Sequence, residues 1–200
     1  MPTKILQITN KPAYPSIDGG CLGMAKMSGF YDTHPDFSLD ILTLETFKHP
    51  FDKKEFSKSL SAEVKIFSVK IKTKPTLIGA IKALAVNESY NLSRFKSKEL
   101  ERKLTQILSE NNYDFIQLEN IFVAQHIDLI KHYSEAKIIL NSANIEHEIW
   151  ERMSNKSSWP KNQYFHILSK QLKQEEQEIW SKVDGIICAT VKDETAIYKH

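Results

Sequence analysis

The sequence predicts an α/β protein with a Rossmann-like, doubly wound and mainly parallel sheet of six to seven strands flanked by helices. Short apolar runs rich in Ile and Val alternate with longer segments of helical periodicity, as expected for parallel strands joined by crossover helices. Several runs are continuously apolar, as strands buried on both faces require. Polar side chains follow several runs directly, at the positions where open α/β sheets bind ligands.

The predicted strands are short and rich in β-branched residues. They span residues 4–9, 39–44, 64–69, 115–118, 137–140 and 185–189.

Two segments have clear helical periodicity. Residues 97–111 place Leu and Ile side chains on one face and Lys and Glu on the other, which is typical of a helix packed on a sheet. Residues 160–183 carry a second apolar stripe, and their polar interior, 173–178, is expected to face solvent or a partner domain.

Two other segments are less regular. Residues 46–62 lack a clear period and are predicted as a loop with one helical turn. Residues 70–95 contain a proline at 75 and an apolar run at 77–86, which predict a helix that reaches away from the sheet. The last residues stop inside a helical pattern, so we expect a fragment of a longer protein.

Length and composition allow one full-sized core, and no linker divides residues 1–200, so we expect a single domain. The net charge is only +2, from 27 basic and 25 acidic residues, which gives no overall attraction to nucleic acid. No apolar stretch approaches the length of a signal sequence or of a membrane span, and we expect a cytoplasmic protein. Cys21 and Cys188 are expected to be free thiols, and no metal site is predicted.

A loop with two glycines follows the first strand. Asp18-Gly19-Gly20 stands directly before a helical segment, where backbone N–H groups can face a phosphate. The spacing matches neither the dinucleotide fingerprint nor the phosphate loop. A simple turn in which Asp18 caps the helix is therefore an equally good interpretation.

Further polar groups follow the fourth, fifth and sixth strands. They are Glu119, Asn120, Asn144, Glu146, Arg152 and Thr190. Because the carboxyl ends of parallel strands share one edge of a sheet, these groups predict a cleft. The plainer alternative for the fifth strand is that Asn144 caps a helix, Glu146 complements its dipole and Arg152 pairs with Glu148.

Four segments, in this order, resemble the N-terminal domain of GT-B retaining glycosyltransferases, the family-4-like group that includes many bacterial polysaccharide and lipopolysaccharide sugar transferases. They are KILQIT with PSIDGG, YDFIQLEN, NSANIEHEIWERM, and the long helical segment that leads into VDGIICATVKDE. Together they cover most of the chain.

The resemblance implies the acceptor-side half of an enzyme that transfers a sugar from a nucleotide-sugar donor to a hydroxyl acceptor, with retention. No bound cofactor or metal is implied, and the nucleotide sugar is a co-substrate. A donor-side domain is expected beyond His200, so this chain alone should be almost inactive. The resemblance implies that Asp18, Gly19 and Gly20 lie near the donor diphosphate and sugar. It also implies that the polar residues after the later strands contact the acceptor or line the cleft.

The chain departs from the family in two places. Glu119 stands where many relatives carry a histidine close to the sugar, so the resemblance implies a catalytic role for this carboxylate. The arginine that many relatives have shortly after the glycine pair is missing, and Lys26 is the next cation along the chain.

Two alternatives and one partner remain open. A stand-alone flavodoxin-like binding or regulatory module would have the same strands, whereas a nicotinamide-dependent oxidoreductase is disfavoured by the glycine spacing. Lys65, Lys70, Lys72 and Lys74 precede the apolar run 77–86. This strip is either a solvated face or a contact with the inner, anionic face of a membrane that carries a lipid-linked acceptor.

Overall fold

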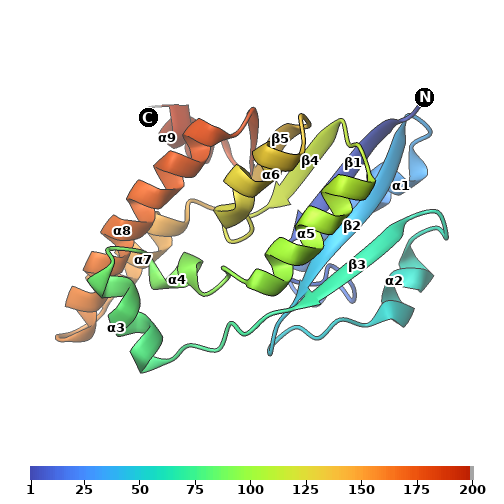
Figure 1. Cartoon of the computed structure of the whole chain (residues 1–200). Coiled ribbons are helices and arrows are strands. Elements are labelled where there is room, and N and C mark those ends of the chain that lie inside the picture. The colour runs from blue at the N-terminus through green and yellow to red at the C-terminus, as the bar shows by residue number, and fades with distance from the viewer. Residues whose placement is uncertain (199–200) are drawn as a thin grey trace.

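A parallel sheet runs through the molecule in the computed structural model, which describes residues 1–198 (Figure 1). Within these residues the sheet has six strands in the order β3-β2-β1-β4-β5-β6, all parallel. The strands are β1 Thr3–Thr9, β2 Phe37–Glu45, β3 Lys65–Lys70, β4 Phe115–Glu119, β5 Lys137–Ser142 and β6 Gly185–Cys188. The predicted fold class and all six predicted strands are confirmed.

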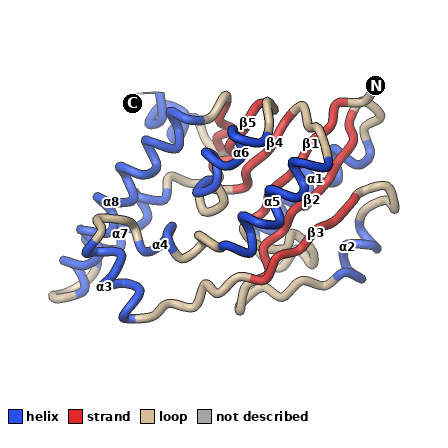
Figure 2. Tube along the Cα trace, in the orientation of Figure 1, coloured by secondary structure: helices blue, strands red, loops and turns tan. Residues whose placement is uncertain are grey.

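Helices connect the strands and cover both faces of the sheet (Figure 2). They are α1 Gly19–Thr33, α2 Lys53–Ser59, α3 Leu77–Ala85, α4 Tyr90–Ser93, α5 Lys98–Glu110, the 3₁₀ turn η1 Ala124–His126, α6 Ile127–Tyr133, α7 Glu146–Lys156, α8 Lys161–Lys182 and α9 Val191–Tyr198. No helix in this part of the chain is both long enough and apolar enough to cross a bilayer.

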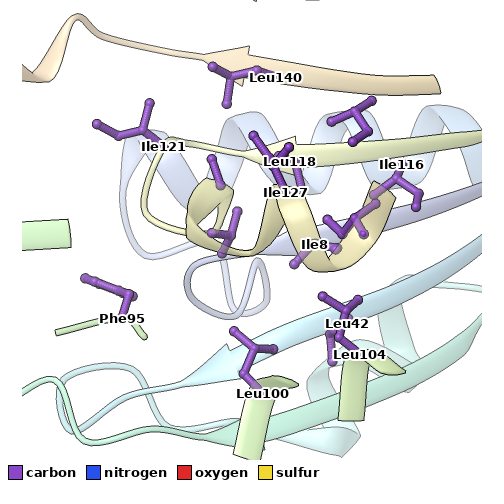
Figure 3. Close-up of a cluster of buried hydrophobic side chains, with 14 of the residues drawn as sticks. Ile8, Leu42, Phe95, Leu100, Leu104, Ile116, Leu118, Ile121, Ile127 and Leu140 are labelled. Carbon is purple, nitrogen blue, oxygen red and sulfur yellow. The ribbon is translucent and has the colours of Figure 1, made fainter. Parts of the chain in front are cut away.

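One face of the sheet is apolar and carries the main core. Alternate strand residues point to this face, among them Ile8, Leu42 and Leu118, and all three are buried. Figure 3 shows them facing side chains of α5 and α6, such as Leu104 and Ile127. The predicted stripe on residues 97–111 is the buried face of α5, which begins after Ser97, whose hydroxyl accepts a hydrogen bond from the Leu100 backbone N–H.

The opposite face is covered by α1 and α2. Ile5 and Ile41 pack there against Phe56 of α2. Closer to the carboxyl ends of the strands, the same face becomes polar: Gln7 and Thr9 are buried there, and Gln7 accepts a hydrogen bond from Ser28 of α1. At the carboxyl ends of the strands, the sheet therefore has an apolar core on one face and a polar layer on the other.

Three predictions between the strands were incomplete. The segment 46–62 contains α2, a helix of seven residues, and the segment 70–95 contains two helices, of which α3 lies well away from the sheet (Figure 1). The prediction that residues 173–178 face solvent or a partner domain was wrong for Glu176, which is fully buried within this chain. Its carboxylate accepts hydrogen bonds from α7, which a helical pattern cannot show.

The segment that holds α3 and α4 is attached to α8 by polar contacts. The backbone N–H of Ser89 donates to Oε1 of Glu175 at 2.8 Å, and Nε2 of Gln171 donates to Oδ1 of Asn87 at 3.3 Å. Oε2 of Glu175 is buried and has no hydrogen-bond partner within residues 1–198. Burial raises the pKa of Glu175 to about 7, because the charged form loses hydration.

The Glu175→Gln substitution should remove a pH dependence of stability. The folded-state pKa lies above the unperturbed value of about 4.3, so the folded protein binds the extra proton, and the free energy of unfolding contributed by Glu175 falls as the pH rises from about 4 to about 7. Glutamine keeps an oxygen acceptor for Ser89 and carries no charge. Urea unfolding from about pH 5 to about pH 8 should show the variant gaining stability relative to wild type.

Glu178→Gln is the matched control, since Glu178 lies on the exposed side of the same helix. Its difference from wild type should change much less over the same range, because the charge of Glu178 is the smallest of the effects that raise the pKa of Glu175. A Glu175→Gln difference that stays constant would contradict the assignment of a raised pKa to Glu175.

Candidate functional site

The strand order reverses between β1 and β4, the two central strands. The chain leaves β1 toward β2 on one side and leaves β4 toward β5 on the other. The loops after β1 and β4 therefore diverge, and open α/β sheets bind ligands in the crevice between such loops.

A cavity of about 360 Å³ lies at this point. Six of the nine site residues predicted from the sequence line it: Gly19, Gly20, Glu119, Asn120, Asn144 and Glu146. Asp18 lies beside it at the start of α1. Arg152 and Thr190 line two other cavities, so the structure does not bring them to this one.

Asp18 caps α1 and forms an ion pair. Its Oδ1 accepts a hydrogen bond from the Cys21 backbone N–H at 2.8 Å, and its Oδ2 lies 2.6 Å from Nζ of Lys11. The hydrogen bond from Lys11, followed by that from Cys21, lowers the pKa of Asp18 to about 2, because both stabilise the carboxylate. The interpretation of Asp18 as a helix cap is thus confirmed.

Gly20 sits directly against this ion pair. A Cβ atom at this position would lie 3.3 Å from Oδ1 of Asp18 and 3.3 Å from Nζ of Lys11. The glycine keeps the ion pair and the cavity in contact with the first turn of α1.

Glu119 is buried at the end of β4 and is held by three amide groups. Nε2 of Gln7 and Nε2 of Gln117 each donate to Oε1 at 2.6 Å. Nδ2 of Asn141 donates to Oε2 at 2.8 Å. Burial raises the pKa of Glu119, and the three hydrogen bonds oppose this effect by favouring the charged form.

The two glutamines continue the network onto α1. Oε1 of Gln7 accepts a hydrogen bond from the hydroxyl of Ser28 at 2.6 Å, and Oε1 of Gln117 accepts one from the hydroxyl of Tyr31 at 2.5 Å. We call Gln7, Ser28, Tyr31, Gln117, Glu119 and Asn141 the Glu119 network. It connects three adjacent strands with the helix whose first turn borders the cavity.

Glu146 and Asn120 form a second polar pair in the cavity. Nδ2 of Asn120 donates to Oε1 of Glu146 at 3.3 Å. Burial, with a smaller effect from the neighbouring Glu176, raises the pKa of Glu146. Asn120 has a left-handed backbone with φ of 79°, and its Oδ1 is buried without a hydrogen-bond partner in the described part of the chain.

The N-terminus of α7, the helix that carries Glu146, is capped by a side chain of another helix. Glu176 of α8 accepts hydrogen bonds from the backbone N–H groups of Glu146 at 2.8 Å and of His147 at 3.0 Å. The same carboxylate lies 2.6 Å from Nδ1 of His147. Asn144 does not cap α7, so that prediction was wrong.

The two remaining site residues have local roles. Arg152 pairs with Glu148 one turn earlier, at 3.3 Å, as the plainer interpretation predicts. The hydroxyl of Thr190 accepts a hydrogen bond from the Asp193 backbone N–H at 3.1 Å and so caps α9.

Sequence reasoning missed three polar residues of the cavity. Asn10, Lys11 and Asn141 also line it, and Lys11 supplies a cation much closer to Gly20 than the sequence order suggests. The signal was available, because Asn10 and Lys11 follow the first strand directly, at the edge where ligands bind.

The lining of the cavity favours hydroxyl groups over phosphates. Its polar side chains are two carboxylates and the amides of four asparagines, and both groups form hydrogen bonds with hydroxyls. Lys11 is the cation that lines it, and Asp18 already neutralises this charge. No group of side chains within residues 1–198 has the composition and geometry of a metal site.

The Glu176→Ala substitution should lower the free energy of unfolding by about 3 kcal/mol, because it leaves buried donors of α7 without an acceptor. Chemical denaturation measures the change. Glu178→Ala, an exposed residue on the same helix, is the control and should change stability by less than about 0.5 kcal/mol. Equal losses in the two variants would show that Glu176 is not the cap.

The Lys11→Met substitution should raise the pKa of Asp18 from about 2 toward the unperturbed value. Because the folded pKa is lowered, the stability that Asp18 contributes is complete above about pH 4 and is lost as the pH falls toward 2. An NMR titration of the Asp18 carboxyl group measures the shift. The control is Lys26→Met, which changes a lysine of α1, the helix that Asp18 caps, and should leave the titration of Asp18 unchanged. If the midpoint does not move in Lys11→Met, Lys11 is not the main cause of the lowered pKa of Asp18.

Comparison by sequence finds no relative: no protein-family model matches, and no curated protein matches. Comparison by structure finds solved proteins of similar fold. UGT71G1 of Medicago truncatula, complexed with UDP-glucose, superimposes with a TM-score of 0.57 at 14% identity, over 99% of this chain and 48% of that one. UGT2 of Phytolacca americana, complexed with UDP-2fluoro-glucose and pterostilbene, gives a TM-score of 0.52 at 12% identity, over 96% and 49%.

A UDP-glucosyltransferase from Polygonum tinctorium, complexed with 3,4-dichloroaniline, gives a TM-score of 0.50 at 13% identity, over 94% and 46% of the two chains. The chain therefore spans about half the length of each of these structures. At such low identity the likeness establishes the fold. The chain has the fold of one half of a GT-B UDP-glycosyltransferase.

Proposed function

We propose that the chain is the acceptor-binding half of a two-domain glycosyltransferase, which transfers a sugar from a nucleotide-sugar donor to a hydroxyl acceptor. The observation that carries this proposal is the cavity at the switch point of the sheet, lined by carboxylates and amides. The order of the sequence motifs and the likeness of the fold to half of UDP-glucose-binding structures support it.

The acceptor side of the proposal rests on the chemistry of the lining. A saccharide presents several hydroxyl groups, each of which can both donate and accept a hydrogen bond. Glu146 can accept from such hydroxyls, and Oδ1 of Asn120, which is buried and unpartnered within residues 1–198, can accept one more. Polysaccharide and lipopolysaccharide acceptors follow from the sequence resemblance.

The donor side of the proposal uses the first turn of α1. Gly19 and Gly20 expose backbone to the cavity at the positive end of the helix dipole, and Lys11 lies beside them. These groups would stabilise the negative charge that gathers on the departing diphosphate. One lysine that is already ion-paired supplies too little positive charge to bind a diphosphate. A second domain beyond His200 would therefore hold most of the nucleotide.

Glu119 is the proposed catalytic group, since it stands at the strand end nearest the reacting sugar in the family that the sequence resembles. Burial raises the pKa of Glu119, whereas the three amides that hold it favour its charged form. In that form a fixed carboxylate would stabilise positive charge that develops on the transferred sugar. Retention at the anomeric carbon follows from the resemblance. NMR of the product anomer tests it separately.

The proposal predicts turnover of a nucleotide sugar by the protein that joins this chain to its donor half, and almost none by the chain alone. Glu119→Gln should lower kcat/KM by about 100-fold because it removes the carboxylate charge. Gly20→Val should raise KM for the donor because its side chain displaces the Lys11–Asp18 pair. Steady-state kinetics with UDP-sugars and a panel of saccharide acceptors measures both effects.

Gly29→Val is the matched control for Gly20→Val. Gly29 lies on the same helix, and a Cβ there would meet no atom within 4 Å, so this variant should keep wild-type kinetics. Thermal unfolding of all variants separates loss of activity from loss of fold. Unchanged kinetics in both Glu119→Gln and Gly20→Val would overturn the site, and no turnover of any nucleotide sugar would favour the flavodoxin-like binding module instead.

A further inference from the structure

The helix α3 turns its large apolar side chains outward. Leu77 and Ile78 are 79% and 69% exposed, and Ile81 and Leu84 are also exposed. At 100° per residue these four positions share one face. A helix at a protein surface normally buries such a face.

The inward side of α3 is built from small residues. Ala83 is its buried residue, and Gly79 lies against the ring of Tyr90, so close that a Cβ there would be 2.6 Å from the Tyr90 hydroxyl. The same hydroxyl accepts a hydrogen bond from the Thr76 backbone N–H at 2.7 Å. These contacts fix the helix with its apolar face outward.

Basic side chains precede this apolar face along the chain, and one lies on the helix itself. Between Glu63 and Glu88 the sequence contains five lysines and no acidic residue. Lys72, Lys74 and Lys82 are exposed, and none of the three forms a salt bridge with residues 1–198. Phe47 is 78% exposed and lies beneath Nζ of Lys74, 5.8 Å from the ring centroid.

We call this region the α3 surface. It comprises Phe47, Lys72, Lys74, Leu77, Ile78, Ile81, Lys82 and Leu84. A second cavity, lined by Phe47 and Lys74, borders it and shares Asn10 and Lys11 with the candidate site. The end of the α3 surface that holds Phe47 and Lys74 therefore lies at the same edge of the molecule as the site.

We propose that the α3 surface docks onto an anionic lipid bilayer. A helix that lies in the plane of a membrane buries an apolar face at the level of the headgroups and places lysines against anionic phosphates. The α3 surface has both features, together with an exposed aromatic ring. Complementary charge thus argues for an anionic bilayer. If the proposed function also holds, a lipid-linked acceptor would reach the cavity from this side.

The test is binding of the 200-residue chain to vesicles, measured by flotation without any turnover, so that it stands apart from the proposed function. The chain should bind vesicles of equal parts phosphatidylcholine and phosphatidylglycerol, and pure phosphatidylcholine vesicles much less. Raising the salt concentration should weaken binding, because it screens the lysines.

Two pairs of substitutions test the two features. Lys72→Glu with Lys74→Glu should weaken binding at least about 25-fold, at about fivefold for each lysine removed. Ile78→Ser with Ile81→Ser should weaken it about tenfold or more, because less apolar surface enters the membrane. Both pairs change exposed side chains, and circular dichroism verifies that the fold is retained.

Two controls match these variants in chemistry but not in position. Lys53→Glu with Lys54→Glu changes two exposed lysines of α2, and Val191→Ser changes an exposed apolar residue of α9; both helices lie far from α3 (Figure 1). Both should bind like wild type.

Three results would overturn the proposal. The first is no binding to either kind of vesicle, and the second is binding that survives in both variant pairs of the α3 surface. The third is a dimer in solution that Ile78→Ser with Ile81→Ser dissociates, without vesicle binding, which would show that a second copy covers this face.

Discussion

The buried carboxylate of Glu119 is the constraint on which the arrangement of the site depends. Burying a charge among apolar side chains is costly unless hydrogen bonds replace the lost hydration, and here amides from β1, β4 and β5 supply them. The three strands must therefore keep their register at the carboxyl edge. Ser28 and Tyr31 extend the same network to α1. The glycines at the start of α1 are thereby placed beside the strand ends.

This network also explains why the two faces of the sheet differ. The face under α5 and α6 consists of aliphatic side chains, which stabilise the fold without directional contacts. The face under α1 uses hydrogen bonds between polar side chains, which have fixed geometry and satisfy every member only in one arrangement. At the carboxyl ends of the strands, apolar packing on one face thus stabilises the fold and hydrogen bonds on the other face position the side chains, and the cavity opens beside the second face.

The strands and α5 could be predicted because their signals are local. Continuous apolar runs indicate buried parallel strands, and the stripe on α5 matches the helical period. The cap of α7 could not be predicted, because Glu176 comes from another helix and lies 30 residues farther along the chain than Glu146. In the sequence, Glu176 belongs to a polar run that resembles a solvated face. The Glu119 network gave a weaker signal in the sequence: Gln7 and Gln117 are polar residues within strands that are otherwise largely apolar.

Protein carboxylates occupy both helix N-termini near the cavity. Asp18 accepts from the first turn of α1, and Glu176 accepts from the first turn of α7. A phosphate at α7 would therefore meet the carboxylates of Glu146 and Glu176, and their repulsion would exceed the attraction of the helix dipole. At α1 the carboxylate of Asp18 is already paired with Lys11, and the backbone of the two glycines borders the cavity. Under the proposed function, a diphosphate in this cavity would therefore approach from the α1 side, and the hydroxyl groups of the proposed acceptor would lie on the α7 side.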